Sequence, residues 1–385
     1  MTKITGDWIT RPATQAVCVM LEGAGYQALF VGGCVRNALL GTEVNDIDIA
    51  TDAHPDQVVA LAEKAGLHAI PTGIDHGTVT VVSDHVPHEI TTFRKDVETD
   101  GRRAVVAFSP RVEDDAHRRD FTMNALYACS DGTVLDPLGG LADLDARRVR
   151  FIDDATERLQ EDYLRALRFF RFHAWYGDEK AGMDADALAA IAANLDGLET
   201  LSRERVGAET LKLLAAPDPA PAVGAMRATG ALARLLPGAD DRALAPLVHL
   251  EGQVGVAPDA LRRLAALGGD DLPKRLRLSR QDGKRLTLLR EQIGTPAGAA
   301  ELGYRFGKDT GCDVLLLRSA VLEMTLPDMM QADLTKGAAA RFPISATDLM
   351  PDVQGPALGA ALTKLENLWI ASGFTLDKHT LLALK

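Results

Sequence analysis

Cysteine is scarce in this sequence, and its few cysteines are too far apart to form a site together. No Cys-x-x-Cys pair and no local set of Cys and His ligands is present, which argues against a zinc site and against a disulfide framework. Small buried thiols are the ordinary role of such residues. The chain has four: Cys18, Cys34, Cys129 and Cys312.

Long apolar segments are also missing. No run approaches the ~20 apolar residues that a helix needs to cross a bilayer, and the N-terminal stretch MTKITGDWITRPATQ lacks the charged-then-apolar order of a secretory signal. Internal repeats and low-complexity segments are absent. We therefore expect a cytoplasmic protein with no membrane contact and no evident protein partner. A chain of 385 residues with 46% hydrophobic content can form two or three globular domains.

Positive charge is in deficit, because the formal net charge is −12 at pH 7. Proteins that bind nucleic acid usually carry a basic signature, so this balance argues against such a partner. The distribution of charge weakens that argument, since a locally basic cleft is compatible with an acidic chain. Basic residues gather at positions 102–103, 118–119, 147–150, 165–171 and 203–205, and between Lys274 and Arg290.

The most informative stretch is LFVGGCVRNALLGTEVNDIDIATD, residues 29–52. Its apolar start stops at Gly32-Gly33 and passes into residues with helical apolar spacing, which predicts a strand, a glycine turn and a helix. Glycines let a phosphate approach the backbone closely, and the first amides of a helix point outward. Arg36 can add a bidentate phosphate donor. Taken alone, this motif is equally typical of an ordinary strand-to-helix turn.

Two acidic residues follow on a predicted strand. Period-two alternation places Ile47 and Ile49 in the core and Asp46 and Asp48 together on the opposite face. Paired carboxylates repel and raise one another's pKa unless a cation bridges them. Because Mg²⁺ binds one or two carboxylates together with substrate phosphates, the pair is a candidate catalytic and metal site. The alternative is a solvated strand face.

The order of these motifs resembles the nucleotidyltransferase superfamily. GGCVRNALLG followed by DIDIATD is similar to the class II group that contains the bacterial tRNA nucleotidyltransferases and poly(A) polymerases. The resemblance implies a nucleotide-binding role for Gly32, Gly33 and Arg36 and a Mg²⁺ site at the two aspartates. One departure is clear, because the family usually has Asp where this chain has Asn37. We assign no role to that position.

A third acidic residue lies further along the chain. In the segment PHEITTF, His88 and Ile90 fall on one face of a predicted strand and Glu89 and Thr91 on the other. Glu89 would align with the aspartate pair if its strand lies beside theirs, and a solvent-facing glutamate is the alternative. The resemblance, in which HEITTFR matches a segment with a third acid, favours a catalytic role. The polar stretch 94–103 that follows predicts a loop that can move over the site.

The segment RRDFTMNA places adjacent polar residues before an apolar stretch. By itself a triplet such as Arg118-Arg119-Asp120 is more often on the surface of a protein than in a functional site. It is similar to the family's ribose- and nucleotide-binding motif, and the resemblance implies this role for Arg119, Asp120 and Asn124, with Arg118 as a further candidate. The segment DPLGGLADL, which begins at Asp136, matches a family turn that we interpret as structural.

A helix with one polar and one apolar stripe is predicted at 160–172. A salt-bridged surface helix would give the same pattern, and its pairs would each contribute only about 0.3–0.5 kcal/mol. The alternative interpretation is a surface that reads the edge of a nucleotide base. The polar stripe comprises Asp162, Arg165, Arg168 and Arg171, and the apolar stripe comprises Leu164, Leu167 and Phe170.

Cytosine and adenine both present an amino donor beside a ring-nitrogen acceptor. Asp162 can accept from the amino group while Arg165 donates to the ring nitrogen, whereas uracil and guanine would leave both contacts mismatched. The pair would therefore accept CTP and ATP and reject UTP and GTP. This matches the family's EDxxR motif, which the resemblance implies replaces a nucleic-acid template. Arg168 and Arg171 extend the stripe as candidate nucleotide-binding residues.

The predicted elements divide the chain into an α+β part and an all-α part. After Ala155 the strand signals end and 3.6-residue periodicity takes over. A segment at 201–214 matches a family helix that supports the base-reading one, with Glu204 and Arg205 as structural residues. We expect helices at 11–25 and 54–65, the second with Asp52 as N-cap, and strands at 27–31, 77–82, 87–93 and 104–108. The expected domains are a catalytic head with a small mixed sheet (1–150), a nucleotide-recognition neck (151–216) and an RNA-binding body and tail (217–385).

The combined motifs indicate a template-independent enzyme that adds C, C and A to the 3′ end of tRNA by two-metal nucleotidyl transfer, releasing pyrophosphate. Poly(A) polymerase and A-only or CC-only addition remain alternatives. The segment beginning at His76 is more similar to the CCA-adding subgroup, and the complete stretch at 94–103 argues against CC-only addition. In another class of function, a catalytically inactive RNA-binding relative would be expected to have lost one of the two aspartates.

Overall fold

The computed structural model describes residues 2–74, 77–100, 103–178, 180–350 and 352–384. Its internal contacts divide the chain into two compact units, Met1–Pro237 and Gly238–Lys385. The domain boundaries expected near 150 and 216 both lie inside the first unit and stay predictions. Among these residues no helix has the length and apolar character needed to cross a membrane.

The first unit is built on a mixed seven-stranded sheet with the strand order β3-β4-β5-β2-β1-β8-β9. Within the described residues, β2 and β5 run parallel, and the other paired strands of this sheet are antiparallel. This confirms the expected α+β head. The strands are β1 (Leu29–Val31), β2 (Asp48–Thr51), β3 (His68–Gly73), β4 (Thr78–Ser83), β5 (Val86–Thr92), β8 (Tyr127–Ala128) and β9 (Val134–Leu135).

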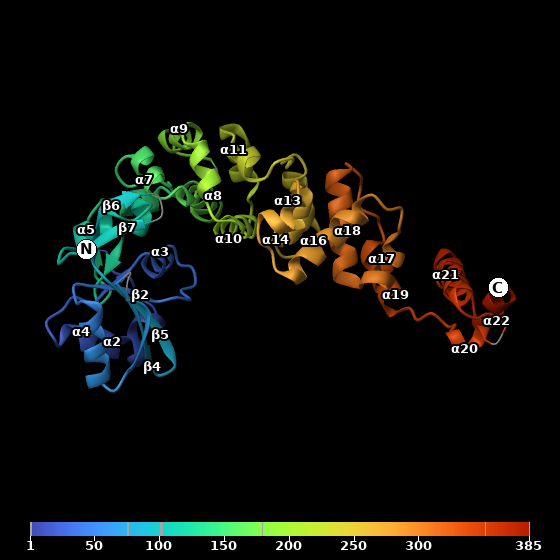
Figure 1. Cartoon of the computed structure of the whole chain (residues 1–385), viewed down its shortest axis with the longest axis horizontal. Helices are drawn as coiled ribbons and strands as arrows, with labels where there is room; N and C mark the ends of the chain where they lie inside the picture. Colours follow the sequence, from blue (N-terminus) through green and yellow to red (C-terminus); the bar gives the residue numbers. More distant parts are fainter. Residues whose placement is uncertain (1, 75–76, 101–102, 179, 351, 385) are drawn as a thin grey trace. The chain divides into compact units, whose positions relative to one another are not determined.

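Two helices pack against the β3–β5 part of the sheet, where Figure 1 shows them side by side: α2 (Pro12–Glu22) and α4 (Pro55–Lys64). Their apolar faces cover the inward residues of the strands, and Val79, Val81 and Ile90 are at most 1% exposed. A further helix, α3 (Gly33–Leu39), packs against β1. The other helical segments of the head are α1 (Asp7–Thr10), α5 (Val112–His117), the 3₁₀ turn η2 (Thr122–Asn124) and α6 (Gly140–Asp145).

Two local predictions for the head were wrong. Asp52 does not cap α4, because its carboxylate accepts the Gln27 backbone N–H at 2.7 Å; His54 is the N-cap residue. The stretch expected as a loop is largely a strand, since β6 (Arg94–Asp100) pairs antiparallel with β7 (Arg103–Phe108). Cross-strand pairing overrides the polar composition that suggested a loop.

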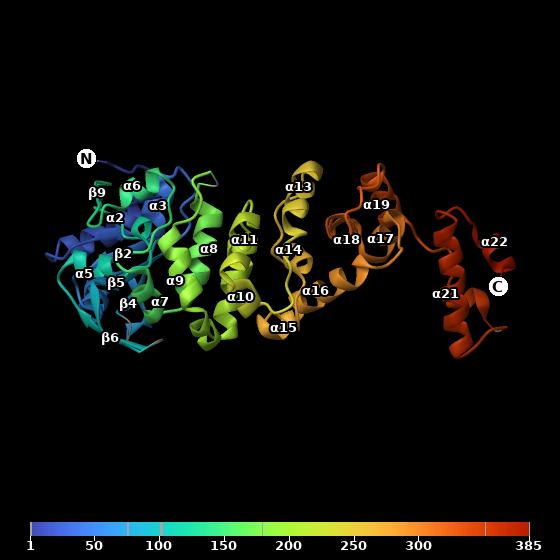
Figure 2. The ribbon, with the colours of Figure 1, turned by 90° about the horizontal axis from the view of Figure 1, so that it is seen from above.

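Helices follow the head without a further strand in the part of the chain that the structure describes, as expected. Figure 2 shows α8, α10 and α11 side by side, and α8 packs against both of the others. The helices that follow the head in the first unit are α7 (Ala155–Glu161), α8 (Leu164–Tyr176), α9 (Ala185–Ala193), η3 (Leu195–Thr200), α10 (Arg203–Leu214), α11 (Ala220–Thr229) and α12 (Ala231–Leu235).

The turn in the DPLGGLADL segment of the head is structural, because Asp136 accepts the backbone N–H groups of Gly140 and Leu141.

The second unit is helical and contains a buried ionic network. Glu251 is 3% exposed and accepts from Arg262 Nε at 2.8 Å and from Arg263 Nη2 at 2.8 Å. Near the C-terminus a separate apolar cluster forms around Leu365 and Trp369. The helices are α13 (Leu244–Val254), α14 (Ala260–Leu267), α15 (Leu272–Arg275), α16 (Arg280–Ile293), α17 (Ala299–Phe306), α18 (Lys308–Val321), α19 (Met330–Ala339), α20 (Ala346–Leu349), α21 (Pro356–Ala371) and α22 (Lys378–Ala383).

Candidate active site

The three candidate catalytic acids come from two neighbouring strands. Asp48 opens β2 and is directly paired with Glu89 of the parallel strand β5, while Asp46 lies two residues before Asp48. Ile47 and Ile49 are 5% and 0% exposed, which confirms the predicted division into a core face and an acidic face. The parallel pairing of β2 with β5 also confirms the predicted alignment of Glu89 with the aspartates.

The acidic face concentrates negative charge. The pKa of Asp48 is raised to about 6, first by burial and then by the charge of Glu89, against the opposing effect of Arg119, with Asp46 adding to the rise. Within the described residues, no group of three or more His, Cys, Asp or Glu side chains is arranged to hold a metal ion. Asp46 and Asp48 remain a two-carboxylate set, which is what Mg²⁺ commonly uses together with substrate phosphates.

The glycine turn lies where backbone and arginines approach closely. Gly32 has φ +69°, and a Cβ there would lie 3.3 Å from Arg119 Nη1. Gly33 begins α3, and its Cβ would lie 3.9 Å from Arg36 Nη2. A side chain at Gly32 would be strained in this backbone conformation and would crowd the guanidinium. The turn therefore brings two of the predicted phosphate ligands to the start of α3.

Arg36 is held by neutral groups on several elements and is 6% exposed. Its Nε and Nη2 donate to Asn37 Oδ1 at 3.2 and 2.9 Å, Nη1 donates to Asn124 Oδ1 at 2.5 Å, and Nη2 donates to the Tyr176 hydroxyl at 2.9 Å. The guanidinium carbon also lies 4.1 Å from the ring centroid of Tyr176 and 5.1 Å from that of Phe172. Burial is the main cause that lowers the pKa of Arg36.

The chain of contacts continues from Arg36 into the predicted ribose motif. Asn124 Nδ2 donates to Asp120 Oδ1 at 2.9 Å, and Arg168 Nε donates to Asp120 Oδ2 at 2.6 Å. Burial would raise the pKa of Asp120, but Arg168 and the hydrogen bond from Asn124 outweigh it, so the pKa lies below its usual value. Four predicted site residues, Arg36, Asn124, Asp120 and Arg168, thus form one continuous network.

Arg119 is fixed by a buried carboxylate that the sequence reasoning missed. Its Nη2 donates to Asp115 Oδ2 at 2.9 Å and its Nε to the Tyr127 hydroxyl at 3.1 Å. Asp115 is 1% exposed and also accepts from Tyr127 at 2.8 Å. The four-residue spacing of Asp115 and Arg119 was a possible signal, because side chains at i and i+4 meet on a helix.

The predicted base-reading residues differ from expectation in their backbone. Asp162 lies between α7 and α8 in an extended conformation (φ −156°, ψ 103°), so the continuous helix expected at 160–172 is wrong. Leu164, Leu167 and Phe170 are buried as predicted. The turn is stabilised by Asp162 itself, whose Oδ1 accepts the Leu164 backbone N–H at 3.1 Å. An aspartate that bonds its neighbouring backbone competes with the helix in this way.

Asp162, Arg165 and Arg171 each form hydrogen bonds with a different set of residues. Asp162 Oδ2 accepts from Arg205 Nη2 at 2.5 Å. Arg165 donates to Glu161 Oε2 at 2.5 Å and to the backbone oxygen of Arg118 at 3.0 Å. Arg171 donates to Glu209 Oε2 at 2.5 Å. The ion pairs of Arg165 and Arg171 join α8 to α7 and to α10, and the hydrogen bond to the Arg118 backbone oxygen joins α8 to the head.

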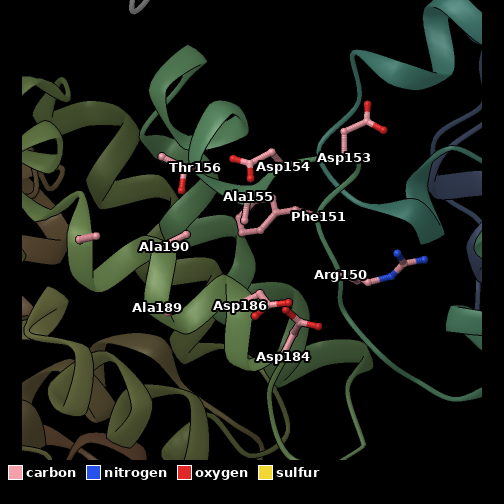
Figure 3. Close-up of a pocket in the computed structure, with 11 residues that line it drawn as sticks. Arg150, Phe151, Asp153, Asp154, Ala155, Thr156, Asp184, Asp186, Ala189 and Ala190 are labelled. Carbon is pink, nitrogen blue, oxygen red and sulfur yellow. The ribbon is translucent and has the colours of Figure 1, made fainter.

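A separate pocket of about 510 Å³ lies between the start of α7 and α9, with several aspartates around its rim (Figure 3). None of the predicted site residues is among those that line it in the described part of the chain. Its lining comprises Arg150, Phe151, Asp153, Asp154, Ala155, Thr156, Asp184, Asp186, Ala189, Ala190 and Ala193.

Comparisons with known proteins show which family the chain belongs to. Residues 28–150 match the model of the poly A polymerase head domain, and residues 182–242 match that of the probable RNA- and SrmB-binding site of polymerase A. The mitochondrial CCA tRNA nucleotidyltransferase 1 of Danio rerio is 32% identical over 379 residues, which cover 93% of this chain and 86% of that protein. The chain belongs to the CCA tRNA nucleotidyltransferase family.

Further members of the CCA tRNA nucleotidyltransferase family match in part or in structure. The CCA-adding enzyme of Geobacillus thermodenitrificans is 42% identical over 59% of this chain and 55% of its own length. The matches to several other members span about half of those proteins' length. The crystal structure of the Bacillus stearothermophilus CCA-adding enzyme in complex with CTP has a TM-score of 0.70 and 26% identity, covering 94% of each chain.

Proposed function

We propose that this protein adds C, C and A to the 3′ end of tRNA from CTP and ATP and releases pyrophosphate. The observation that carries the proposal is the parallel pairing of β2 with β5, which places Asp48 beside Glu89. The glycine turn lies close to Arg119 at Gly32, and the charge of Arg119 acts on Asp48. Carboxylates beside phosphate-binding groups are the components that nucleotidyl transfer requires.

The residues of the network have distinct roles in this proposal. Gly32 and Gly33 let the triphosphate approach the backbone, and Arg36 and Arg119 attract its charge. Asp120 and Asn124 offer hydrogen bonds to the ribose beside them. Orientation of the terminal tRNA 3′-hydroxyl toward the α-phosphorus is the main contribution that such a site can make.

Mg²⁺ fits the donor set of the acidic face. Asp46 and Asp48 would hold it, because hard carboxylate oxygens are its preferred protein ligands. The pKa of Asp48 is raised first by burial and then by the charge of Glu89. When bound, the ion supplies activation of the attacking hydroxyl and charge neutralisation at the leaving pyrophosphate. Glu89 adds negative charge beside Asp48 that strengthens the attraction for a divalent cation.

Base selection is assigned to Asp162 and Arg165, with Arg168 and Arg171 extending the same surface. Asp162 Oδ1 accepts a hydrogen bond from the Leu164 backbone N–H, and Oδ2 accepts one from Arg205. Each carboxylate oxygen can accept a second. Asp162 can therefore still accept the amino proton of cytosine or adenine. Arg165 likewise has further N–H groups beyond its contacts with Glu161, Arg158 and Arg118.

The second unit and tRNA binding complete the proposal. The body and tail (217–385) are proposed to hold the tRNA, and the match of residues 182–242 to a model of a probable RNA-binding site supports this for the start of that region. Poly(A) addition and partial CCA addition are the alternatives within the class. His76, which begins a segment similar to the CCA-adding subgroup, lies outside the described residues, as do positions 101–102 of the stretch at 94–103.

The deciding experiment uses purified protein, Mg²⁺ and tRNA that lacks its last three nucleotides. Incubation with each nucleoside triphosphate alone and with all four together should extend the tRNA by CCA only when both CTP and ATP are present. Long adenosine tracts would identify a poly(A) polymerase. Binding of tRNA without any extension would identify a catalytically inactive relative and refute the proposal.

A further inference from the structure

Trp175 is an exposed aromatic side chain near the end of α8. It is 41% exposed, whereas Trp369 is 4% exposed. Trp8 is half-buried and packs edge-on against the ring of Phe30, with 5.0 Å between the ring centroids. Tryptophan is large and highly buried on average in folded proteins. The open ring of Trp175 is therefore a candidate contact surface.

The ring lies on the open face of α8, which also carries Arg168. The two residues are seven positions apart, which is about two helical turns and about 10.5 Å along the axis, so they share a face of the helix. Leu167 and Phe170, on other sides of α8, are 3% and 0% exposed. Arg168 contacts Asp120 of the predicted ribose motif. The open face of α8 thus extends from the proposed nucleotide site to Trp175.

The neighbouring helix α10 holds the ring and adds a positive charge. Trp175 Nε1 donates to the backbone oxygen of Lys212 at 2.8 Å, which fixes the polar edge of the indole. The Lys212 side chain is 63% exposed, and its Nζ lies 4.0 Å from Glu209 Oε1, a long separation that leaves it able to attract a phosphate. Proteins bind single-stranded nucleic acid with exposed aromatic rings beside basic groups. Residues 182–242, which include Lys212, match the probable RNA-binding model.

We propose that Trp175 is a stacking platform for an unpaired base at the 3′ end of the tRNA, with Lys212 attracting the adjoining phosphate. The inference rests on the proposed function and extends it, because it adds a contact for the tRNA strand apart from the residues that hold the incoming nucleotide. Every base has a π face, so stacking tolerates any base. Such tolerance suits an enzyme whose substrate ends in a new nucleotide after each addition.

Intrinsic fluorescence tests the contact directly, because a base that stacks on an indole decreases its emission. The full-length protein is titrated in Mg²⁺, without triphosphates, with tRNA that lacks its last three nucleotides. Emission should fall for the wild type and for Trp8→Phe, the matched control. Trp175→Phe should lose most of this decrease and still bind the tRNA, because its ring can also stack. CTP alone should leave the emission of Trp175 unchanged.

Trp175→Phe and Trp175→Leu form a matched pair for the energetics. Both lose the hydrogen bond to Lys212, and only phenylalanine keeps a π face. Compared with Trp175→Phe, Trp175→Leu should weaken tRNA binding on the order of tenfold, while the KM for CTP stays the same. The difference should vanish for an RNA hairpin with the same stem and a fully paired 3′ end, whereas a merely structural defect at the end of α8 would weaken both RNAs alike.

The outcomes separate this inference from the proposed function. An equal fall in emission for the wild type and Trp175→Phe, in a wild type that extends tRNA, would overturn the inference alone. Equal tRNA affinity of the Phe and Leu variants, or an equal loss for the fully paired hairpin, would also overturn it. If Trp175→Leu does not fold, the fluorescence of the wild type and Trp175→Phe decides. A wild type whose Trp175 responds to tRNA but that extends nothing would refute the proposed function and leave the stacking contact standing.

Discussion

Replacing Asp162 by alanine is the sharpest test of base selection. The alternative is that Asp162 has only a structural role. Asp162 and Arg205 form an ion pair in which both side chains are 31% exposed. If that pair and the hydrogen bond from the Leu164 backbone N–H are all that Asp162 provides, its removal costs at most about 2 kcal/mol. The corresponding loss of activity is at most about thirtyfold and is the same for every nucleotide.

A residue that reads a base edge behaves differently. A site built to hydrogen-bond its substrate rejects a mismatched partner by factors on the order of 10⁴. Asp162→Ala should therefore lower CTP and ATP incorporation strongly and raise the relative use of UTP and GTP. The acidic face of β2 and β5 is untouched by this change, so Mg²⁺ binding should stay at the wild-type level.

The assay measures incorporation of each of the four triphosphates singly into tRNA that lacks its last three nucleotides. Arg205→Ala is the matched control, because it breaks the same ion pair while leaving the carboxylate free to accept. It should lower stability slightly and keep the preference for CTP and ATP. If Asp162→Ala kept the four relative rates of the wild type, base selection by this residue would be refuted.

The other predictions concern the acidic face, the tRNA contacts, the second unit and acid stability. Asp48→Asn should abolish nucleotide addition in Mg²⁺ while tRNA affinity persists, and retained activity would exclude the catalytic assignment. Binding of tRNA should weaken steeply with rising salt, and a flat salt dependence would show that the basic clusters do not contact phosphate. Glu251→Gln removes the negative charge that pairs with two buried arginines. It should lower the free energy of unfolding by about 3–5 kcal/mol, measured by thermal or denaturant unfolding. Glu301→Gln, which changes an exposed pair with Arg305, should lower it by under about 1 kcal/mol. Burial raises the pKa of Asp115, but Arg119 and Arg118 lower it more, so the pKa lies below its usual value. The ionised carboxylate therefore stabilises the fold fully above about pH 4, and this stabilisation is lost as the pH falls through the lowered pKa of the folded state. Asp115→Asn should reduce this dependence of the unfolding midpoint on acid pH.

Local patterns were sufficient to predict the β2 segment. Alternation of Ile47 and Ile49 with two aspartates needs only the two-residue period of a strand, and burial of both isoleucines follows from it. The alignment of Glu89 with Asp48 was conditional, because pairing of strands far apart in the chain cannot be derived from either segment alone. The family resemblance supplied that missing information.

The residues that escaped prediction act through long-range contacts or local competition. Nothing near Asp162 in sequence signals its pairing with Arg205, which is 43 positions away. The end of the helix at this position depends on a side chain that bonds its own backbone, and periodicity does not detect it. The hydrogen bonds from Arg36 to Asn37 and Tyr176 could not be predicted either, because they form only where the fold brings the three side chains together.

The contact between Arg36 and Tyr176 also sets an order of events during protein synthesis. The two residues are separated by 140 positions, and the ribosome adds about 5–20 residues per second. For at least several seconds, therefore, the emerging head has its glycine turn and acidic strand but lacks the aromatic ring and hydroxyl that fix the guanidinium. A nascent chain that ends before α8 lacks part of the proposed nucleotide site, so catalytic competence is delayed until α8 has left the ribosome and has packed against Arg36 and Asp120.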